Sequence, residues 1–157
     1  MHQVYLGLGS NLGDRKTILE TAVRQVEERV GPVRKCSSFI ETEPWGFESD
    51  HTFLNAVVLC ETTMTPRKLL QTTQQIERDM GRKRKGTQRY QDRLIDIDIL
   101  MYDDLTVDEP DLKIPHPLMQ ERDFVMIPLN ELLLTDKLTI TDNEKTIPDN
   151  RNDGAGN

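Results

Sequence analysis

The amino-acid sequence predicts an α+β fold, a ferredoxin-like split βαβ sandwich with a βαββαβ core and C-terminal additions. Two observations lead to this prediction. Segments with strand-like and helix-like apolar patterns follow one another in the order strand, helix, strand, strand, helix, strand. The chain has 157 residues, and domains usually take roughly 100 to 200 residues. We therefore expect one domain over residues 1–140, with both helices on one face of the sheet, and a flexible tail over residues 141–157.

Glycine and proline separate the first three elements. Residues 3–8 are apolar and β-prone and end in the glycine-rich stretch GLGSNLGD, which predicts a strand followed by a loop. A helix should follow, because apolar residues recur on one stripe until Gly31 and Pro32 end it. The stripe consists of Leu19, Ala22, Val23, Val26 and Val30. Residues 33–43 then form a strand-like segment.

The second half of the core begins with a clear strand over residues 53–62, FLNAVVLCET. Thr65 before Pro66 predicts a helix start, because threonine caps helices and proline is favoured at the first helical position. That helix should end at Gly81. The stretch RLIDIDILMY predicts a strand with alternating faces. We expect Ile95, Ile97, Ile99 and Met101 on one face, and Leu94, Asp96, Asp98 and Leu100 on the other.

The residues after 103 add to this core. Residues 103–117 predict irregular chain with short extended pieces, and residues 124–134 predict a helix that is interrupted near Pro128. From Thr141 onward Ile147 is the only large aliphatic residue. This composition predicts the flexible tail.

Composition argues against several classes of protein. The net charge is -7, from 20 basic and 27 acidic residues, which disfavours a general nucleic-acid or acidic-membrane binder. Apolar runs are far shorter than the roughly 18 residues of a membrane span, and residues 1–10 lack a signal-peptide pattern. The chain has two cysteines, Cys36 and Cys60, with neither a CxxC motif nor the spacing of a zinc site. This argues against a disulfide scaffold and against a thiolate metal site. We expect a cytoplasmic monomer that binds neither nucleic acid nor a membrane.

Asp96 and Asp98 form the most informative pair of residues. Residues two apart on a strand share a face and lie about 7 Å apart along it. Like charges on a half-buried face repel each other unless a cation joins them, and Mg²⁺ commonly takes one or two carboxylates together with substrate phosphates. The alternative is a structural pairing with Arg82 or Arg93 and no metal.

A basic segment directly precedes this pair. Residues 82–93, RKRKGTQRYQDR, carry six basic residues and one acidic residue in an acidic protein. A solvated charged loop would explain such a run. Together with the aspartates, however, the segment predicts a site that holds a polyphosphate from two sides, by Mg²⁺ and by guanidinium groups. The expected chemistry is phosphoryl or nucleotidyl transfer.

Two glycine patterns miss the familiar nucleotide motifs. Gly7, Gly9 and Gly13 are not spaced as a dinucleotide fingerprint, and Gly81 with Gly86 lacks the lysine of a Walker A loop. A bound ATP would therefore be held in another way.

Several further residues allow two explanations. His116 between two prolines either contacts a phosphate or ribose or is structural. Asn55 either satisfies backbone groups or reads the hydrogen-bonding edge of a ligand. Aromatic residues beside a Gly/Pro loop either pack in the core or enclose a flat heterocycle. These aromatic residues are Trp45, Phe47, Phe53 and Phe124.

Together these features resemble the 6-hydroxymethyl-7,8-dihydropterin pyrophosphokinase family of folate biosynthesis, from about Val4 to Leu134. The matching stretches occur in family order and spacing, and they are LGLGSNLGDR, ETEPWGF, FLNAVVLCET, IERDMGRKRK, RLIDIDILMYD and IPHPLMQERDFVMIPLNEL. The DxD stretch and the PHP segment are the most specific. The resemblance implies transfer of pyrophosphate from ATP to the pterin hydroxymethyl group, which gives AMP.

The resemblance also implies roles for individual residues. Asp96 and Asp98 would hold two Mg²⁺ ions, and Arg82 and Arg93 would lie on the transferring phosphates. Nucleotide contacts are implied for Gln74, Glu77, Arg84, Lys85, Arg89, Ile99, His116 and Arg122. Pterin contacts are implied for Thr42, Pro44, Trp45, Gly46, Phe53, Asn55 and Phe124. The chain departs from the family pattern at Tyr90, Gln91 and Asp92, where Trp-Gly-Pro is common, and at Trp45, where an aliphatic residue is more usual.

Two other functions fit part of the pattern. A metal-dependent nucleotidyltransferase would use the same strand aspartates but would release pyrophosphate instead of AMP. A non-enzymatic RNA-binding module shares the topology, yet it needs exposed sheet aromatics and a basic surface.

Overall fold

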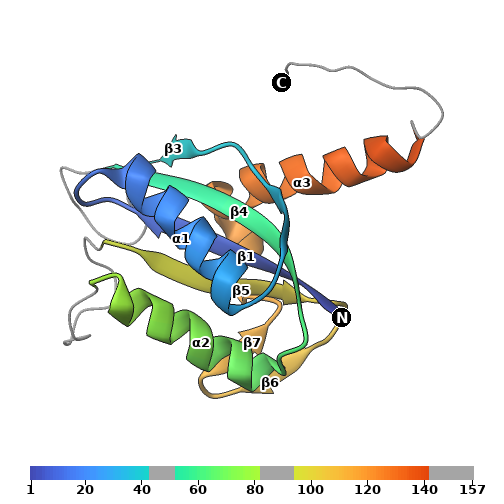
Figure 1. Ribbon diagram of the computed structural model, residues 1–157. Coiled ribbons are helices and arrows are strands. Elements are labelled where there is room, and N and C mark those ends of the chain that lie inside the picture. The colour runs from blue at the N-terminus through green and yellow to red at the C-terminus, as the bar shows by residue number, and fades with distance from the viewer. Residues whose placement is uncertain (43–51, 82–93, 142–157) are drawn as a thin grey trace.

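The protein, described by a computed structural model, has its residues 1–42, 52–81 and 94–141 in defined positions (Figure 1). The elements in chain order are β1 (His2–Ser10), α1 (Arg15–Arg29), β2 (Val33–Cys36), β3 (Ile40–Thr42), β4 (Phe53–Thr62), α2 (Pro66–Asp79), β5 (Asp96–Tyr102), β6 (Val107–Glu109), β7 (Leu112–Ile114), the 3-10 helix η1 (Met119–Glu121) and α3 (Asp123–Thr141).

The main sheet has the strand order β2-β4-β1-β5, with β3 also paired to β4, and all of these pairs are antiparallel. Helix α1 follows β1 and helix α2 follows β4, so each half of the core is a split βαβ unit. Figure 1 shows α1 and α2 side by side on one face of the sheet. The ferredoxin-like fold predicted from the sequence is confirmed.

One core lies between these two helices and the sheet. Its fully buried side chains include Leu19 and Val26 of α1, Leu69 and Ile76 of α2, and Leu6 of β1. A side chain caps the start of each helix, and the sequence predicts the cap at Thr65. The Thr65 hydroxyl accepts from the Lys68 N–H at 3.2 Å, and Asp14 accepts from the Thr17 N–H at 3.3 Å. These contacts satisfy N–H groups that the first helical turn leaves without a partner.

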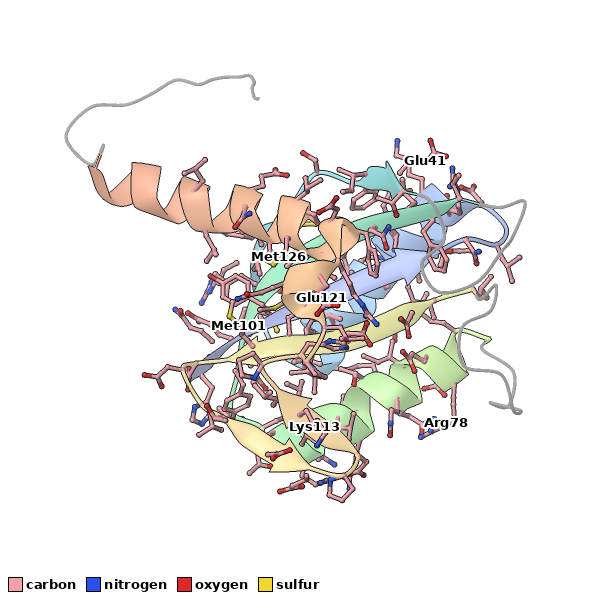
Figure 2. The ribbon with its side chains drawn as sticks, turned by 180° about the vertical axis from the view of Figure 1, so that it is seen from behind. Glu41, Arg78, Met101, Lys113, Glu121 and Met126 are labelled. Atoms are coloured by element: carbon pink, nitrogen blue, oxygen red, sulfur yellow. The ribbon has the colours of Figure 1, made fainter. Side chains whose placement is uncertain are left out.

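Helix α3 covers part of the opposite face of the sheet, where Val125, Leu129 and Leu132 are buried. They pack with Val57 and Leu59 of β4. Figure 2, the view from behind, shows α3 lying across this face. No helix in residues 1–42, 52–81 or 94–141 is long and apolar enough to cross a membrane.

The expected interruption of this last helix is wrong. Helix α3 runs from Asp123 to Thr141 with Pro128 inside it, seven residues beyond the expected end. Proline removes one intrahelical donor and usually costs about 3 kcal/mol in a helix interior. Pro128 is buried, and its neighbours Val125 and Leu129 are buried against the sheet. The burial of this face offsets the missing hydrogen bond. Residues 142–157, for which the sequence predicts a flexible tail, lie outside the described residues.

Other expected boundaries also change. Strand β1 continues through Gly7 and Gly9 to Ser10, so the start of GLGSNLGD is strand and not loop. The expected single segment over residues 33–43 is two short strands, β2 and β3, which both pair with β4. The extended pieces expected after residue 103 are β6 and β7, which form a two-stranded hairpin.

The alternation expected along β5 breaks at its end. Leu6 pairs with Ile99, but the preceding Tyr5 pairs with Met101, so Leu100 is an extra residue in the strand. Such a bulge reverses the faces of the residues that follow. Met101 consequently packs with the α3-side cluster, as its position in Figure 2 also shows, whereas Tyr102 joins the core under α1 and α2. The expected common face of Ile99 and Met101 is therefore wrong.

Candidate active site

The sheet face opposite α1 and α2 carries polar residues beyond the part that α3 covers, and we call this surface the site face. Its residues come from β3, β4, β1 and β5. Across the sheet, Asn55 pairs with Gly9 and Gly9 pairs with Asp96, while Val57, Gly7 and Asp98 form the adjoining row. Because cross-strand partners share a face, the strand register brings Asn55 and the two aspartates to the same surface.

On this surface β1 carries glycine at positions 7 and 9, so it has no side chains of its own there. A Cβ atom on Gly9 would lie 2.7 Å from Oδ1 of Asn55 and 3.5 Å from Cδ2 of Phe53. The first distance is too short for a real side chain, so Asn55 in this position requires glycine at position 9. At Gly7 the nearest atoms to a Cβ atom would be those of the Leu100 side chain, at an ordinary 3.5 Å. The two glycines form a strip without side chains between Asn55 and the aspartates.

Asp96 and Asp98 lie on the site face and are both partly buried, as their spacing predicts. Carboxylate oxygens are ligands that Mg²⁺ prefers. Within the described part of the chain, no group of three or more His, Cys, Asp or Glu side chains is arranged to hold a metal ion. Mg²⁺ commonly takes one or two carboxylates together with substrate phosphates and water, and the pair Asp96 and Asp98 fits such an ion.

Glu77 of α2 supports the strand that carries both aspartates. It is 6% exposed, and its Oε2 atom accepts a hydrogen bond of 2.6 Å from the backbone N–H of Ile97. Ile97 stands between Asp96 and Asp98, and β5 is the last strand of the described sheet. The resemblance implied a nucleotide contact for Glu77, and the structure gives this carboxylate a contact that fixes β5.

Gln74 and Ile99, two other residues with an implied nucleotide contact, differ in position. Gln74 is exposed and lies one turn before Glu77 on α2. The side chain of Ile99 is 7% exposed and belongs to the core under α1 and α2. A contact from Ile99 to a nucleotide would therefore have to use its main-chain groups.

His116 lies beside β5 because its backbone N–H donates to the Leu100 carbonyl at 3.0 Å. The Leu118 N–H donates to Nδ1 of the ring at 3.4 Å, which assigns the proton of the neutral ring to Nε2. Burial lowers the pKa of His116, nearby Arg122 lowers it further, and Asp96 raises it. Arg122 and Asp96 thus both act on His116, and the net lowering favours a neutral ring that donates through Nε2.

Arg122 brings a positive charge to the same region. It is only 7% exposed, and its guanidinium carbon lies 5.4 Å from the centre of the Phe124 ring. A guanidinium group over an aromatic face gains a cation–π attraction, and the charge and planar donor geometry of such a group suit phosphate oxygens. Phe124 itself is partly buried against the α3-side cluster.

Three of the residues with implied pterin contacts, Thr42, Phe53 and Asn55, lie together on the neighbouring strands β3 and β4. Thr42 pairs with Phe53 and Ile40 pairs with Asn55 across β3 and β4. Asn55 is 4% exposed, and its Nδ2 atom donates to the Thr42 hydroxyl at 2.6 Å. Phe53 and Thr42 are partly exposed beside it. An amide edge and an aromatic ring thus stand beside the glycine strip.

The remaining predicted site residues lie outside the described residues. They are Arg82, Arg84, Lys85, Arg89 and Arg93 of the basic segment, and Pro44, Trp45 and Gly46 of the loop before β4. Their implied roles stay predictions.

Sequence reasoning missed the glycine strip and the contacts of Arg15. Gly7 and Gly9 were compared only with nucleotide-binding loops, although glycine at alternate positions of an apolar strand is itself a signal of a close approach by a ligand or another chain segment. Arg15 forms hydrogen bonds to Glu41 and Thr52, and no local pattern indicates such distant partners.

Comparison with known proteins finds a matching family and close relatives of this chain. The family model described as 7,8-dihydro-6-hydroxymethylpterin-pyrophosphokinase (HPPK) matches residues 5–134. A 2-amino-4-hydroxy-6-hydroxymethyldihydropteridine pyrophosphokinase of Porphyromonas gingivalis is 50% identical over 131 residues, which are 82% of this chain and 89% of that protein. The protein of the same name from Bacillus subtilis is 43% identical over 129 residues, or 82% of this chain and 76% of that protein.

A solved structure shows the same fold in a larger protein. The crystal structure of wild-type Plasmodium falciparum HPPK-DHPS with SDX-DHP has a TM-score of 0.66 and 20% identity, and the similarity covers 83% of this chain and 39% of that chain. The present chain thus spans less than half of that protein, and at this identity the similarity concerns the fold. The family model and the two relatives identify the chain itself as a member of the 7,8-dihydro-6-hydroxymethylpterin-pyrophosphokinase family.

Proposed function

We propose that the site face catalyses the pyrophosphoryl transfer of this family, from ATP to the hydroxymethyl group of 6-hydroxymethyl-7,8-dihydropterin, in folate biosynthesis. The hydroxymethyl oxygen bonds to the β-phosphorus of ATP and releases its proton to solvent, the bond between the β-phosphorus and the oxygen that bridges it to the α-phosphate breaks, and AMP leaves with that oxygen. The single observation that carries the proposal is the row Asn55, Gly9, Asp96. This row places the Asn55 amide, which can form hydrogen bonds with the edge of a heterocycle, near the Asp96 carboxylate, which suits a phosphate-bound cation.

The nucleotide side of the site has three groups with distinct tasks. Asp96 and Asp98 are proposed to hold Mg²⁺, two ions according to the resemblance, and such ions neutralise the phosphate charge that opposes attack. Arg122 supplies a positive charge that acts on His116, as the negative charge of Asp96 also does. His116 offers a neutral Nε2–H donor to a phosphate or ribose oxygen. Because such transfer needs little covalent help, positioning and charge neutralisation supply most of the rate.

The pterin side of the site recognises a flat ring with donors and acceptors on its edge. Asn55 presents an amide that is oriented by its hydrogen bond to Thr42. Phe53 and Phe124 are proposed to stack on the two faces of the ring, a geometry that aromatic rings favour. Glycine at position 9 leaves the space that the Asn55 amide occupies, because a Cβ atom there would lie 2.7 Å from its Oδ1 atom.

The basic segment and the loop before β4 complete the proposal. Arg82, Arg84, Lys85, Arg89 and Arg93 are proposed to contact ATP, with Arg82 and Arg93 on the transferring phosphates. Pro44, Trp45 and Gly46 are proposed to contact the pterin. A cytoplasmic location and a monomeric state remain predictions from the sequence.

Product analysis tests the proposed reaction. The protein is incubated with ATP, Mg²⁺ and the reduced pterin, and the products are separated and quantified. The proposal predicts AMP and pterin pyrophosphate in equal amounts, with no free pyrophosphate. Release of free pyrophosphate together with a pterin nucleotide adduct would instead identify a nucleotidyltransferase, the alternative that shares the strand aspartates.

A further inference from the structure

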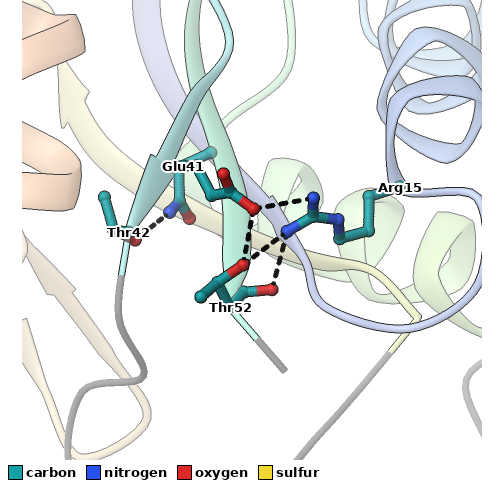
Figure 3. Close-up of polar contacts among 5 residues, drawn as sticks. Arg15, Glu41, Thr42 and Thr52 are labelled. Carbon is teal, nitrogen blue, oxygen red and sulfur yellow. Dashed lines mark hydrogen bonds and ion pairs between the residues drawn. The ribbon is translucent and has the colours of Figure 1, made fainter. Parts of the chain in front are cut away.

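Arg15 connects three separate parts of the chain at the edge of the sheet. Its Nη1 atom donates to the backbone carbonyl and to the hydroxyl of Thr52, both at 2.9 Å. Its Nη2 atom donates to Oε2 of Glu41, also at 2.9 Å. The Thr52 hydroxyl donates to the same carboxylate oxygen at 2.7 Å. Figure 3 shows these contacts, which we call the Arg15 clasp.

The clasp lies on the side of the sheet that faces away from the proposed pterin site. Glu41 pairs with Leu54, whose side chain packs against the core under α1 and α2. Its neighbour Thr42 points to the site face, because adjacent residues of a strand alternate. Figure 3 shows Thr42 beside the clasp, and the Thr42 hydroxyl accepts a hydrogen bond from Asn55.

The strand that the clasp holds has little stability of its own. Strand β3 has three residues, and in the described part of the chain it pairs with β4 alone. Short edge segments with few hydrogen bonds open most readily. Thr52 directly precedes β4, so the clasp ties β3 to the start of its partner strand. It thereby limits the sliding and fraying that would move Thr42 away from Asn55.

The clasp uses the particular shape of an arginine side chain. Two nitrogens of one planar guanidinium group reach acceptors on two different chain segments at once, which a lysine ammonium group does not do with the same rigidity. The hydrogen bond from Thr52, and then the hydrogen bond and charge of Arg15, hold the pKa of the Glu41 carboxyl below its usual range. The acceptor therefore remains charged at neutral pH.

We infer that Arg15 is a positioning residue for the pterin site, which fixes Thr42 and Asn55 through Glu41 and Thr52 without touching the ligand. This inference rests on the proposed function. Exposed ion pairs contribute little to global stability, and Glu41 is well exposed. The effect of Arg15 is therefore local, on the geometry of β3, and it separates pterin binding from nucleotide binding.

The test compares Arg15→Gln and Arg15→Lys with Arg34→Gln. Arg34 donates to Glu61 at 3.0 and 3.1 Å between β2 and β4, an ion pair that does not border β3. Calorimetry measures binding of α,β-methylene-ATP with Mg²⁺, and then of the reduced pterin in the presence of that analogue. Hydrogen exchange measures the amides of β3 in the unliganded protein, and thermal unfolding checks overall stability.

Arg15→Gln should weaken pterin binding about fivefold or more, with faster exchange in β3. Affinity for the ATP analogue and the melting temperature should stay close to those of the unaltered protein. The pterin affinity of Arg15→Lys should lie between that of Arg15→Gln and that of the unaltered protein. Arg34→Gln should change neither pterin affinity nor exchange in β3. In a double-mutant cycle, Glu41→Gln added to Arg15→Gln should cost less than the sum of the single changes, because both remove one interaction.

Three results would overturn the inference, and the third would also refute the proposed function on which it rests. Unchanged pterin affinity in Arg15→Gln, with the unaltered protein binding pterin normally, would show that the clasp does not position the site. Equal loss of pterin and nucleotide affinity would show a general structural role. Failure of the unaltered protein to bind the reduced pterin at all would refute the proposed function itself, and the inference with it.

Discussion

Thr42 orients Asn55, because the Nδ2 atom of Asn55 donates to the Thr42 hydroxyl at 2.6 Å and its Oδ1 atom faces Gly9. A Cβ atom added to Gly9 would lie 2.7 Å from that oxygen. The side chain of Asn55 therefore has one position, which depends on a neighbour on each side.

Gly9→Ala should accordingly displace the Asn55 amide and weaken pterin binding. Loss of one buried hydrogen-bond partner costs about 1 to 3 kcal/mol, or roughly 5- to 150-fold in affinity. Gly7→Ala is the matched control, since its Cβ atom would meet Leu100 at an ordinary 3.5 Å. Calorimetric titration of the pterin checks both variants. Equal pterin affinity in the two variants would contradict this account of Gly9.

Removal of the Asn55 amide should have a selective effect. Asn55→Leu leaves donors and acceptors of the pterin without a partner, so pterin affinity should fall by the same range, roughly 5- to 150-fold. Phe124→Ala should also weaken pterin binding, because the lost stacking is worth about 0.5 to 1.5 kcal/mol beyond the buried area of the ring. Binding of the ATP analogue should change little in Asn55→Leu. Loss of nucleotide affinity with normal pterin affinity would mean that the two pockets are assigned the wrong way round.

Glu77 should matter for stability as well as for the site. Glu77→Leu leaves the Ile97 N–H without the carboxylate that accepts its hydrogen bond, and the free energy of unfolding should fall by about 1 to 3 kcal/mol. Glu77→Gln keeps a carbonyl acceptor and should lose clearly less. Urea unfolding measures both, with Gln74→Leu, an exposed position one turn earlier on α2, as the control. If Glu77→Leu proves as stable as the unaltered protein, the contact with Ile97 does not hold β5.

The structure also predicts how His116 titrates. Burial first, and then Arg122, lower the pKa of His116 against an opposing effect of Asp96, so it should titrate below the ordinary value of about 6.5. The unfolded chain then takes up this proton first as the pH falls. Stability from this group is complete above about pH 6.5 and decreases between that pH and the lower folded-state pKa.

Nuclear magnetic resonance of the ring, without Mg²⁺ or nucleotide, measures this pKa directly. Arg122→Gln should raise it, because a nearby positive charge is removed. A value at or above 6.5 in the unaltered protein would mean that the ring is neither buried nor close to Arg122 in solution.

Much of the fold follows from local sequence patterns. Strand β4 has the predicted bounds, and α2 begins at Pro66 after its Thr65 cap as expected. Asp96 and Asp98 share a face because two-residue spacing alone determines it. These features depend on neighbours in the chain, so one sequence is enough to predict them.

The errors have a common cause, which is tertiary contact. Proline rules predict a break at Pro128, but burial against the sheet keeps α3 continuous. The bulge at Leu100 depends on pairing with β1. Arg15 and Thr52 are 37 residues apart, so nothing local indicates the clasp. The pairing of Gly9 with Asn55 depends on the register of β1 against β4, so the sequence alone does not indicate it.

The central claim is that Asp96 and Asp98 serve pyrophosphoryl transfer on the site face, and the most direct measurement is the rate of AMP formation by Asp96→Asn and Asp98→Asn. Both changes keep side-chain size and remove the charge that suits Mg²⁺. Asp108→Asn is the control, because Asp108 pairs with Lys113 in the exposed hairpin. The account predicts that turnover falls by orders of magnitude in the first two variants and stays normal in the third, with all three folded. Near-normal turnover in either Asp96→Asn or Asp98→Asn at ordinary Mg²⁺ concentration would contradict it.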